Sequence, residues 1–185
     1  LCRGEDPSAV VFLPGGRMAQ RVYKELLLTT RTQAPAFVPT PLVLEGLTEP
    51  QGTDWRVSCR RTVCPAEAPA APGHFYLNCE AVCHPLTVRP RAVGDEIHLP
   101  GRMGCKSLKK LMIDEKVPRR IRERIPVISD DMGVIAVAGF GPEESRLARP
   151  GEDAWEITFM CGRGPGEDQP PQAAGEDEEY AGSGY

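Results

Sequence analysis

The chain has 185 residues, with 22 Lys and Arg against 26 Asp and Glu, a formal net charge of −4 and 41% hydrophobic residues. These values exclude wholesale disorder and a membrane protein, so we expect no membrane partner. Glycine and proline, at 19 residues each, make long helices unfavourable. Charged residues at positions 3, 5 and 6 interrupt any apolar segment of a signal peptide, and we therefore expect a cytoplasmic protein.

Lys and Arg are concentrated in the middle of the sequence. Residues 89 to 124 contain 11 basic and 5 acidic residues, whereas residues 165 to 185 contain 6 acidic residues and no basic ones. The overall acidity therefore comes from the C-terminal third of the chain, and it does not argue against an anionic partner for the middle.

The first predicted elements surround a glycine-rich turn. Residues 9 to 13 are apolar and predict a strand, and the following Pro-Gly-Gly is typical of a hairpin turn, because such turns need positive φ angles. Residues 18 to 28 fit either a second strand or an amphipathic helix, since Met18, Val22 and Leu26 are spaced four residues apart. Periodicity alone leaves both alternatives open.

The next segment is rich in proline. Four prolines between residues 33 and 50 indicate edge strands and turns, and the alternation of residues 55 to 63 predicts another strand. Residues 65 to 73 have the composition of a flexible or polyproline-like connector. We place a boundary between two subdomains there.

A short helical region is expected after the connector. Ser107 is a good N-cap for a helix whose apolar face includes Leu108, Leu111 and Met112 and which Pro118 ends or restarts. Residues 119 to 124 form a second helical turn or two. On either side of this region the sequence predicts strands at residues 75 to 77, 85 to 89 and 155 to 159, and a hairpin at residues 127 to 138.

Together these elements predict an α+β fold that is rich in β structure. It has short antiparallel strands in two small subdomains and a short helical insert around residues 107 to 124. We assign residues 1–72 to a β-rich substrate-binding or connecting region and residues 74–160 to a second domain. Residues 161–185 are rich in Gly, Pro, Asp and Glu, and we expect a disordered acidic tail.

A glycine-containing segment before the predicted helix partly resembles a nucleotide-binding loop. Residues 101 to 107 read Gly-Arg-Met-Gly-Cys-Lys-Ser, but Cys105 separates the glycine from the Lys-Ser pair that a Walker A loop needs in direct succession. We do not expect ATP hydrolysis there. Contact with a single phosphate through the helix N-terminus and Lys106 stays open.

Candidate catalytic and metal-binding residues are few. The three histidines have no partnered nucleophile, so we predict no catalytic residue. The spacing of Cys59, Cys64, Cys79 and Cys83 only loosely fits zinc, which leaves a zinc-binding regulatory domain as a weak alternative and no metal ligand predicted. We also expect no cofactor in this chain. Most of the seven cysteines are expected to be reduced thiols.

The basic window predicts contact with nucleic acid, because clustered Lys and Arg neutralise phosphates and release counterions. A solvated helix face is the alternative. The window contains no Phe, Tyr or Trp, which favours a duplex or folded RNA over a stacked single strand. The predicted RNA-binding residues are Arg89, Arg91, Lys106, Lys109, Lys110, Lys116, Arg119, Arg120, Arg122 and Arg124.

The motif carried by this window resembles a known family. Arg89-Pro90-Arg91, Gly94-Asp95, Lys109-Lys110-Leu111 and Lys116-Val117-Pro118-Arg119 occur at the spacing seen in the C-terminal domain of bacterial tRNA(Ile)-lysidine synthetase. The similarity is strong from residue 86 to about 140. Residues 13 to 16, with Arg21 and Tyr23, are similar to the stretch before that domain in the same family, which favours two strands over a helix there.

The resemblance implies a carbon–nitrogen ligase that uses ATP to join lysine to the wobble cytidine of tRNA(Ile), so that the anticodon reads AUA. ATP, with Mg, would be bound by an N-terminal catalytic domain that lies outside this sequence. This chain would supply tRNA binding at the acceptor stem rather than catalysis. Expected partners are tRNA(Ile), the protein's own N-terminal catalytic domain and a second copy of the chain in a homodimer.

The same resemblance assigns the basic residues of the motif to RNA contact, and Gly94 and Asp95 to a turn. The rival interpretation is a structural module that packs against the catalytic domain and leaves its basic face solvated.

Overall fold

The computed structural model describes residues 10–14, 17–22, 25–30, 35–67 and 73–162. Residues 163–185 of the predicted acidic tail therefore lie outside the described residues, whereas Cys161, its first residue, is the end of a strand. Within the described ranges no helix is long and apolar enough to cross a membrane.

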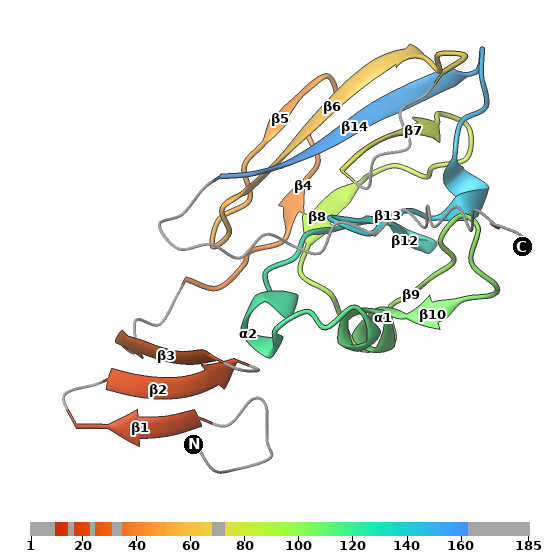
Figure 1. Cartoon of the computed structure of the whole chain (residues 1–185). Helices are drawn as coiled ribbons and strands as arrows, with labels where there is room; N and C mark the ends of the chain where they lie inside the picture. Colours follow the sequence, from red (N-terminus) through yellow and green to blue (C-terminus); the bar gives the residue numbers. More distant parts are fainter. Residues whose placement is uncertain (1–9, 15–16, 23–24, 31–34, 68–72, 163–185) are drawn as a thin grey trace, which may run out of the picture.

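A three-stranded antiparallel sheet forms the N-terminal part of the chain (Figure 1). Its strands are β1 (Val10–Leu13), β2 (Arg17–Val22) and β3 (Glu25–Thr30). β2 lies in the middle and pairs with both neighbours. Residues 18–22 and 25–28 are therefore in strands, as the family resemblance implied, and the helical alternative is wrong for them.

Two larger antiparallel sheets follow. The first has the order β13-β12-β11-β8-β4 and consists of β4 (Thr40–Pro41), β8 (Thr87–Arg89), β11 (Val127–Asp130), β12 (Gly133–Val137) and β13 (Gly141–Pro142). The second has the order β5-β6-β14-β7 and consists of β5 (Gly46–Thr48), β6 (Trp55–Val63), β7 (His74–Asn78) and β14 (Asp153–Cys161). The short strands β4 and β5 lie at sheet edges, and β4 contains Pro41, whose missing N–H costs no ladder bond there.

The remaining elements are short. β9 (Glu96–Ile97) pairs with β10 (Lys106–Ser107), which runs directly into α1 (Leu108–Asp114); α2 (Arg119–Arg122) and the 3₁₀ helix η1 (Glu144–Arg146) complete the set. The Ser107 hydroxyl accepts a hydrogen bond from the Lys110 amide at 3.4 Å, so the predicted N-cap is confirmed. With helices this short the fold is mainly β, and the α+β description holds only in part.

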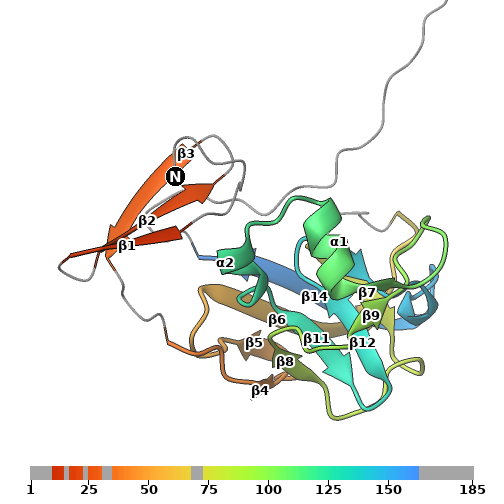
Figure 2. The same ribbon diagram turned by 90° about the horizontal axis from the view of Figure 1, so that it is seen from below.

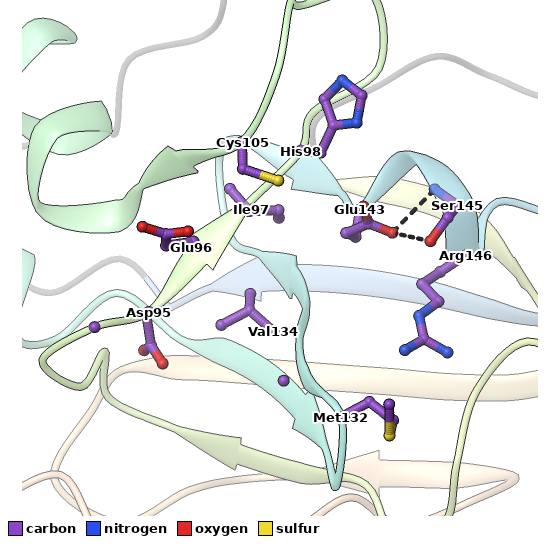
Figure 3. Close-up of a pocket in the computed structure, with 12 residues that line it drawn as sticks. Asp95, Glu96, Ile97, His98, Cys105, Met132, Val134, Glu143, Ser145 and Arg146 are labelled. Atoms are coloured by element: carbon purple, nitrogen blue, oxygen red, sulfur yellow. Dashed lines mark hydrogen bonds between the residues drawn. The ribbon is translucent and has the colours of Figure 1, made fainter.

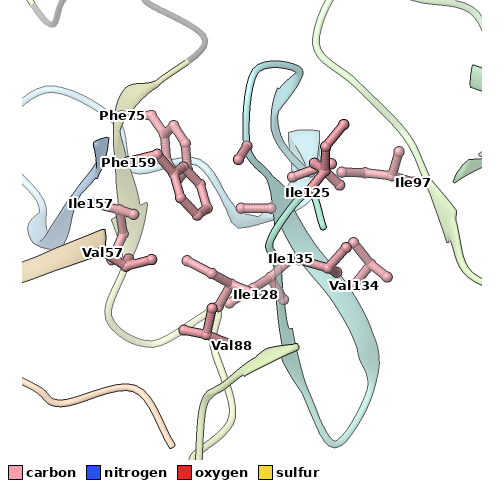
Figure 4. Close-up of a cluster of buried hydrophobic side chains, with 14 of the residues drawn as sticks. Val57, Phe75, Val88, Ile97, Ile125, Ile128, Val134, Ile135, Ile157 and Phe159 are labelled. Atoms are coloured by element: carbon pink, nitrogen blue, oxygen red, sulfur yellow. The ribbon is translucent and has the colours of Figure 1, made fainter. Parts of the chain in front are cut away.

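The two larger sheets enclose one hydrophobic core. Alternate residues of β14, including Ile157 and Phe159, face Val88 and Ile128 of the other sheet (Figure 4). Leu108, Leu111 and Met112 of α1 are fully buried in the same cluster. The apolar faces read from the sequence therefore meet between the sheets and beneath α1.

The predicted subdomain boundary does not separate the sheets. β6 and β7 lie on either side of residues 65 to 73, yet both pair with β14. β4 likewise pairs with β8 from beyond that segment. The division into residues 1–72 and 74–160 therefore cuts through both larger sheets, because strands from both sides complete them.

The hairpin between β11 and β12 is held by a buried carboxylate. The Asp130 side chain is 0% exposed; its Oδ1 accepts from the amides of Met132 and Gly133 at 2.8 and 3.0 Å. Its Oδ2 accepts from the Cys83 amide at 3.2 Å and lies 3.6 Å from Nη2 of Arg146. One side chain therefore joins the hairpin turn, the loop before β8 and η1.

We expect Asp130→Ala to lower the free energy of unfolding by roughly 3 kcal/mol, because it removes the carboxylate that three backbone amides share and that faces the Arg146 guanidinium. Urea denaturation followed by far-UV circular dichroism measures the change. Asp131→Ala is the matched control, since Asp131 is the next residue and its carboxylate is exposed. Equal effects of the two substitutions would contradict the assignment.

Candidate nucleic-acid interface

Arg89 is turned into the protein at the start of the basic window. Its Nη1 and Nη2 donate to the two carboxylate oxygens of Asp95 at 2.8 and 3.0 Å, and its Nε donates to Ser129 Oγ at 3.0 Å. Nη1 also donates to the Pro90 carbonyl. All three nitrogens of the guanidinium are thus used inside the protein, and we leave Arg89 out of the RNA-contacting set.

Asp95 connects this loop to the first helix. Its Oδ2 accepts from the Ala92 amide at 2.6 Å in the expected turn, where Gly94 has a φ of 90°. Its carbonyl accepts from the Leu108 amide at 2.9 Å, at the first residue of α1. Burial disfavours the ionised carboxylate, but hydrogen bonds from Arg89 and Ala92 outweigh it and hold the pKa of Asp95 below its ordinary value.

Two further arginines of the window hold α2 in place. Arg91, from the loop after β8, pairs through Nη2 with Glu123, the residue that follows α2. Arg122 donates from Nε to the Val117 carbonyl at 2.7 Å. Both side chains bond to groups of the protein next to the short helix and stabilise it, which reduces their capacity to contact a ligand.

Three more cations are placed around the helices in different ways. Arg124 donates to the Gly52 carbonyl at 3.2 Å, which fastens the end of α2 to the loop before β6. Lys106 Nζ lies 2.6 Å from Asp114 Oδ2, and this hydrogen bond lowers the pKa of Asp114. Lys116 is exposed, and its positive φ of 55° turns the chain between the helices.

Four cations of the predicted set are exposed on the helices, and we call them the helical basic face: Lys109, Lys110, Arg119 and Arg120. α1 and α2 lie next to each other in both views (Figures 1 and 2). Because Leu108, Leu111 and Met112 face the core, Lys109 and Lys110 lie on the outer side of α1.

The acidic residues near this face are already paired with other cations. Asp114 is paired with Lys106, Glu115 with Arg102 and Glu123 with Arg91. In the part of the chain that the structure describes, neither Lys109 nor Arg119 forms an ion pair. The intramolecular pairs thus use four of the five acidic residues of the window and leave positive charge on the exposed helix surface.

A groove of about 390 Å³ opens beside this region (Figure 3). Ile97 and Val134, which are almost fully buried, form its floor, and the exposed side chains of Cys105 and Met132 stand at its sides. The carboxylate of Glu143 also lines it. These residues come from four separate segments of the sequence, and no local pattern links them, so the sequence alone does not predict the groove.

The glycine-containing loop before α1 does not present a free phosphate site. Two amides at the start of the helix are used, by the Asp95 carbonyl and by the Ser107 hydroxyl. Lys106, which we expected to reach a phosphate, is directed to Asp114. The arrangement therefore gives no support to the phosphate contact considered from the sequence.

The cysteines also give no support to the zinc alternative. Cys59 is buried in the main core, and burial raises the pKa of its thiol to about 11, whereas Cys64 belongs to a separate small apolar cluster. Cys83 is exposed. Among the described residues no group of three or more His, Cys, Asp or Glu side chains is arranged to hold a metal ion.

Residues 86–159 match the family described as TilS substrate C-terminal domain. A bifunctional protein TilS/HprT of Listeria monocytogenes serotype 4b (strain F2365) is 30% identical over 137 residues, which cover 73% of this chain and 21% of that protein. The tRNA(Ile)-lysidine synthase of Bacillus subtilis (strain 168) is 30% identical over 136 residues, which cover 70% of this chain and 28% of the relative.

A solved structure described as the crystal structure of TILS C-terminal domain has the same fold. It superposes with a TM-score of 0.62 at 24% sequence identity and covers 69% of this chain and 98% of its own. The chain itself spans only 21 to 28% of the length of the two relatives above.

The Arg89–Asp95 pair makes stability depend on pH. The folded pKa of Asp95 lies below the unfolded value of about 3.9, so the ionised carboxylate stabilises the fold at neutral pH and this contribution is lost as pH falls through the folded pKa. We expect Asp95→Asn to cost about 2 kcal/mol at pH 7. The difference from wild type should shrink below about pH 4.

Urea denaturation at a series of pH values checks this expectation. Glu96→Gln is the control, because it removes a neighbouring but exposed carboxylate. A difference between wild type and Asp95→Asn that does not change with pH would contradict it.

Proposed function

We propose, from the membership of residues 86–159 in the TilS substrate C-terminal domain family, that this chain is the tRNA-recognition part of a tRNA(Ile)-lysidine synthetase. The parent enzyme would be a cytoplasmic ligase that joins lysine to the wobble cytidine of tRNA(Ile) so that it reads AUA. Its catalytic region, with ATP and Mg, would lie in the part of the relatives' length that this chain does not span. The chain would then contribute binding at the acceptor stem.

The observation that carries this proposal is that the cations of the window fall into two groups, one bonded within the protein and one exposed on the helices. Arg89, Arg91, Lys106, Arg122 and Arg124 are engaged within the protein. The helical basic face remains exposed while its acidic neighbours are paired. An exposed cluster of Lys and Arg on short, rigid helices is suited to the phosphates of a folded RNA.

We expect the chain to bind tRNA with an affinity that falls steeply with salt. Replacing Lys109, Lys110 and Arg119 with Gln should weaken binding at least tenfold and lower the slope of log K against log salt by about 2 to 3, because each cation that meets a phosphate releases a counterion. Fluorescence anisotropy with labelled tRNA over a salt series measures both quantities.

The control is a second triple variant with the same change in charge. Arg17, Arg56 and Arg149 are exposed and lie outside the helical basic face, so their replacement with Gln should leave the slope nearly unchanged. Equal losses in the two triple variants, or binding without a salt slope, would refute specific contact through the helices.

Packing against the catalytic region is a second candidate role, and the three-stranded sheet favours it. Val11, Leu13, Leu26 and Leu28 lie on one face of that sheet by their strand register and are 38 to 66% exposed. None of them belongs to the core between the larger sheets. A sheet of three short strands needs an apolar partner on one face to be stable.

If this role is correct, Leu26→Ser/Leu28→Ser should weaken capture of the separately produced catalytic region by at least tenfold, since about two buried leucines are removed from the contact. A pull-down with purified components measures capture, and tRNA binding should be unchanged. Capture that does not respond to the substitution, or that tRNA abolishes completely, would argue against this face as the docking surface.

A further inference from the structure

The groove beside α1 combines an apolar floor with a carboxylate of fixed orientation. Glu143 caps η1: its Oε2 accepts from the Ser145 amide at 2.9 Å and from the Ser145 hydroxyl (Figure 3). The Glu143 amide donates a hydrogen bond to the Ile135 carbonyl at 2.9 Å. The carboxylate is thus held against the groove before any ligand arrives.

This combination suits a flat, partly apolar ligand that carries a hydrogen-bond donor. An unpaired nucleobase has these properties, because its faces can lie on Ile97 and Val134 and against Met132 while its exocyclic amine donates to a carboxylate. The volume of about 390 Å³ is within the range of small-molecule sites. A phosphate fits poorly, since Glu96 and Glu143 both line the groove and the guanidinium of Arg146, which also lines it, is directed to Asp130 and the Ala81 carbonyl.

The groove is also placed to receive a base from an RNA held on the helical basic face. Cys105, which lines it, is followed directly by β10 and α1, so the groove and Lys109 belong to one continuous stretch of chain. We propose that the groove binds one unpaired nucleobase next to the RNA duplex held by the helices. This inference rests on the proposed function and adds a site to it.

The test compares a short blunt RNA duplex with the same duplex carrying one unpaired 3′ nucleotide. We expect the overhang to increase affinity about tenfold and to protect Cys105 from N-ethylmaleimide, as measured by peptide mass spectrometry. Cys83 and Cys161 are also exposed but do not line the groove, so their alkylation rates serve as internal references. The blunt duplex should protect none of the three.

Filling the groove should remove the preference for the overhang. Cys105→Trp places a large ring at the groove, whereas Met103→Trp places the same ring in the same exposed loop but outside the groove. We expect the Cys105→Trp protein to bind both duplexes equally and the Met103→Trp protein to behave as wild type. The midpoints of urea denaturation verify that both variants are folded. The alkylation experiment uses the wild-type protein and therefore does not depend on the folding of the variants.

The carboxylate predicts a base preference as well. Cytosine and adenine carry an exocyclic amine, whereas the carbonyl oxygens of uracil would face Glu143, so an overhanging C or A should bind about fivefold better than U. Glu143→Gln keeps an oxygen to cap η1 but should narrow this difference.

Two outcomes separate the groove from the proposed function. Equal binding of blunt and overhanging duplexes with no protection of Cys105 overturns the groove and leaves RNA binding by the helices intact. Failure to bind either duplex, or tRNA, overturns the proposed function and the groove with it.

Discussion

The bidentate pair between Arg89 and Asp95 is the constraint on which the helical region depends. It closes the loop between β8 and β9, and the carbonyl of the same Asp95 receives the first amide of α1. The orientation of α1 relative to the larger sheets is therefore fixed by an ion pair at one end and by its buried apolar face along its length. Helices as short as α1 and α2 are not stable alone and need such tertiary support.

The motif that makes the basic window recognisable thus has two parts with different physical roles. Its first arginines bind carboxylates and keep the loop and α2 in position, whereas the side chains of the helical basic face are exposed. Guanidinium groups suit the first role because of their planar, bidentate geometry. A count of cations in the sequence does not separate these two groups.

Features set by neighbouring residues could be predicted from the sequence. The Ser107 cap and the hairpin turn around Asp130 depend on side chain to backbone contacts over two or three residues, and both are present. The continuity of the sheets could not be predicted in this way, because β6 and β7 are joined only through β14, far along the chain.

The candidate site shows the same difference between local features, which the sequence predicts, and contacts between distant residues, which it does not. The ten predicted cations were chosen by charge alone, and their sorting depends on partners such as Glu123, which is distant in sequence from Arg91. The groove was missed for the same reason, since Ile97 and Val134 become neighbours only in the folded chain. Local chemistry is readable from one sequence, whereas long-range pairing is not.

The central position of β14 has a consequence for synthesis of the protein. This nine-residue strand lies between β6 and β7 and comes after every other strand of the two larger sheets. Until it leaves the ribosome, the edges of β6 and β7 that pair with β14 have no partner strand, and the apolar residues of the core stay incompletely covered. The domain therefore folds as a unit only near the end of its own translation, and the nascent chain before that point exposes unpaired strand edges that invite aggregation.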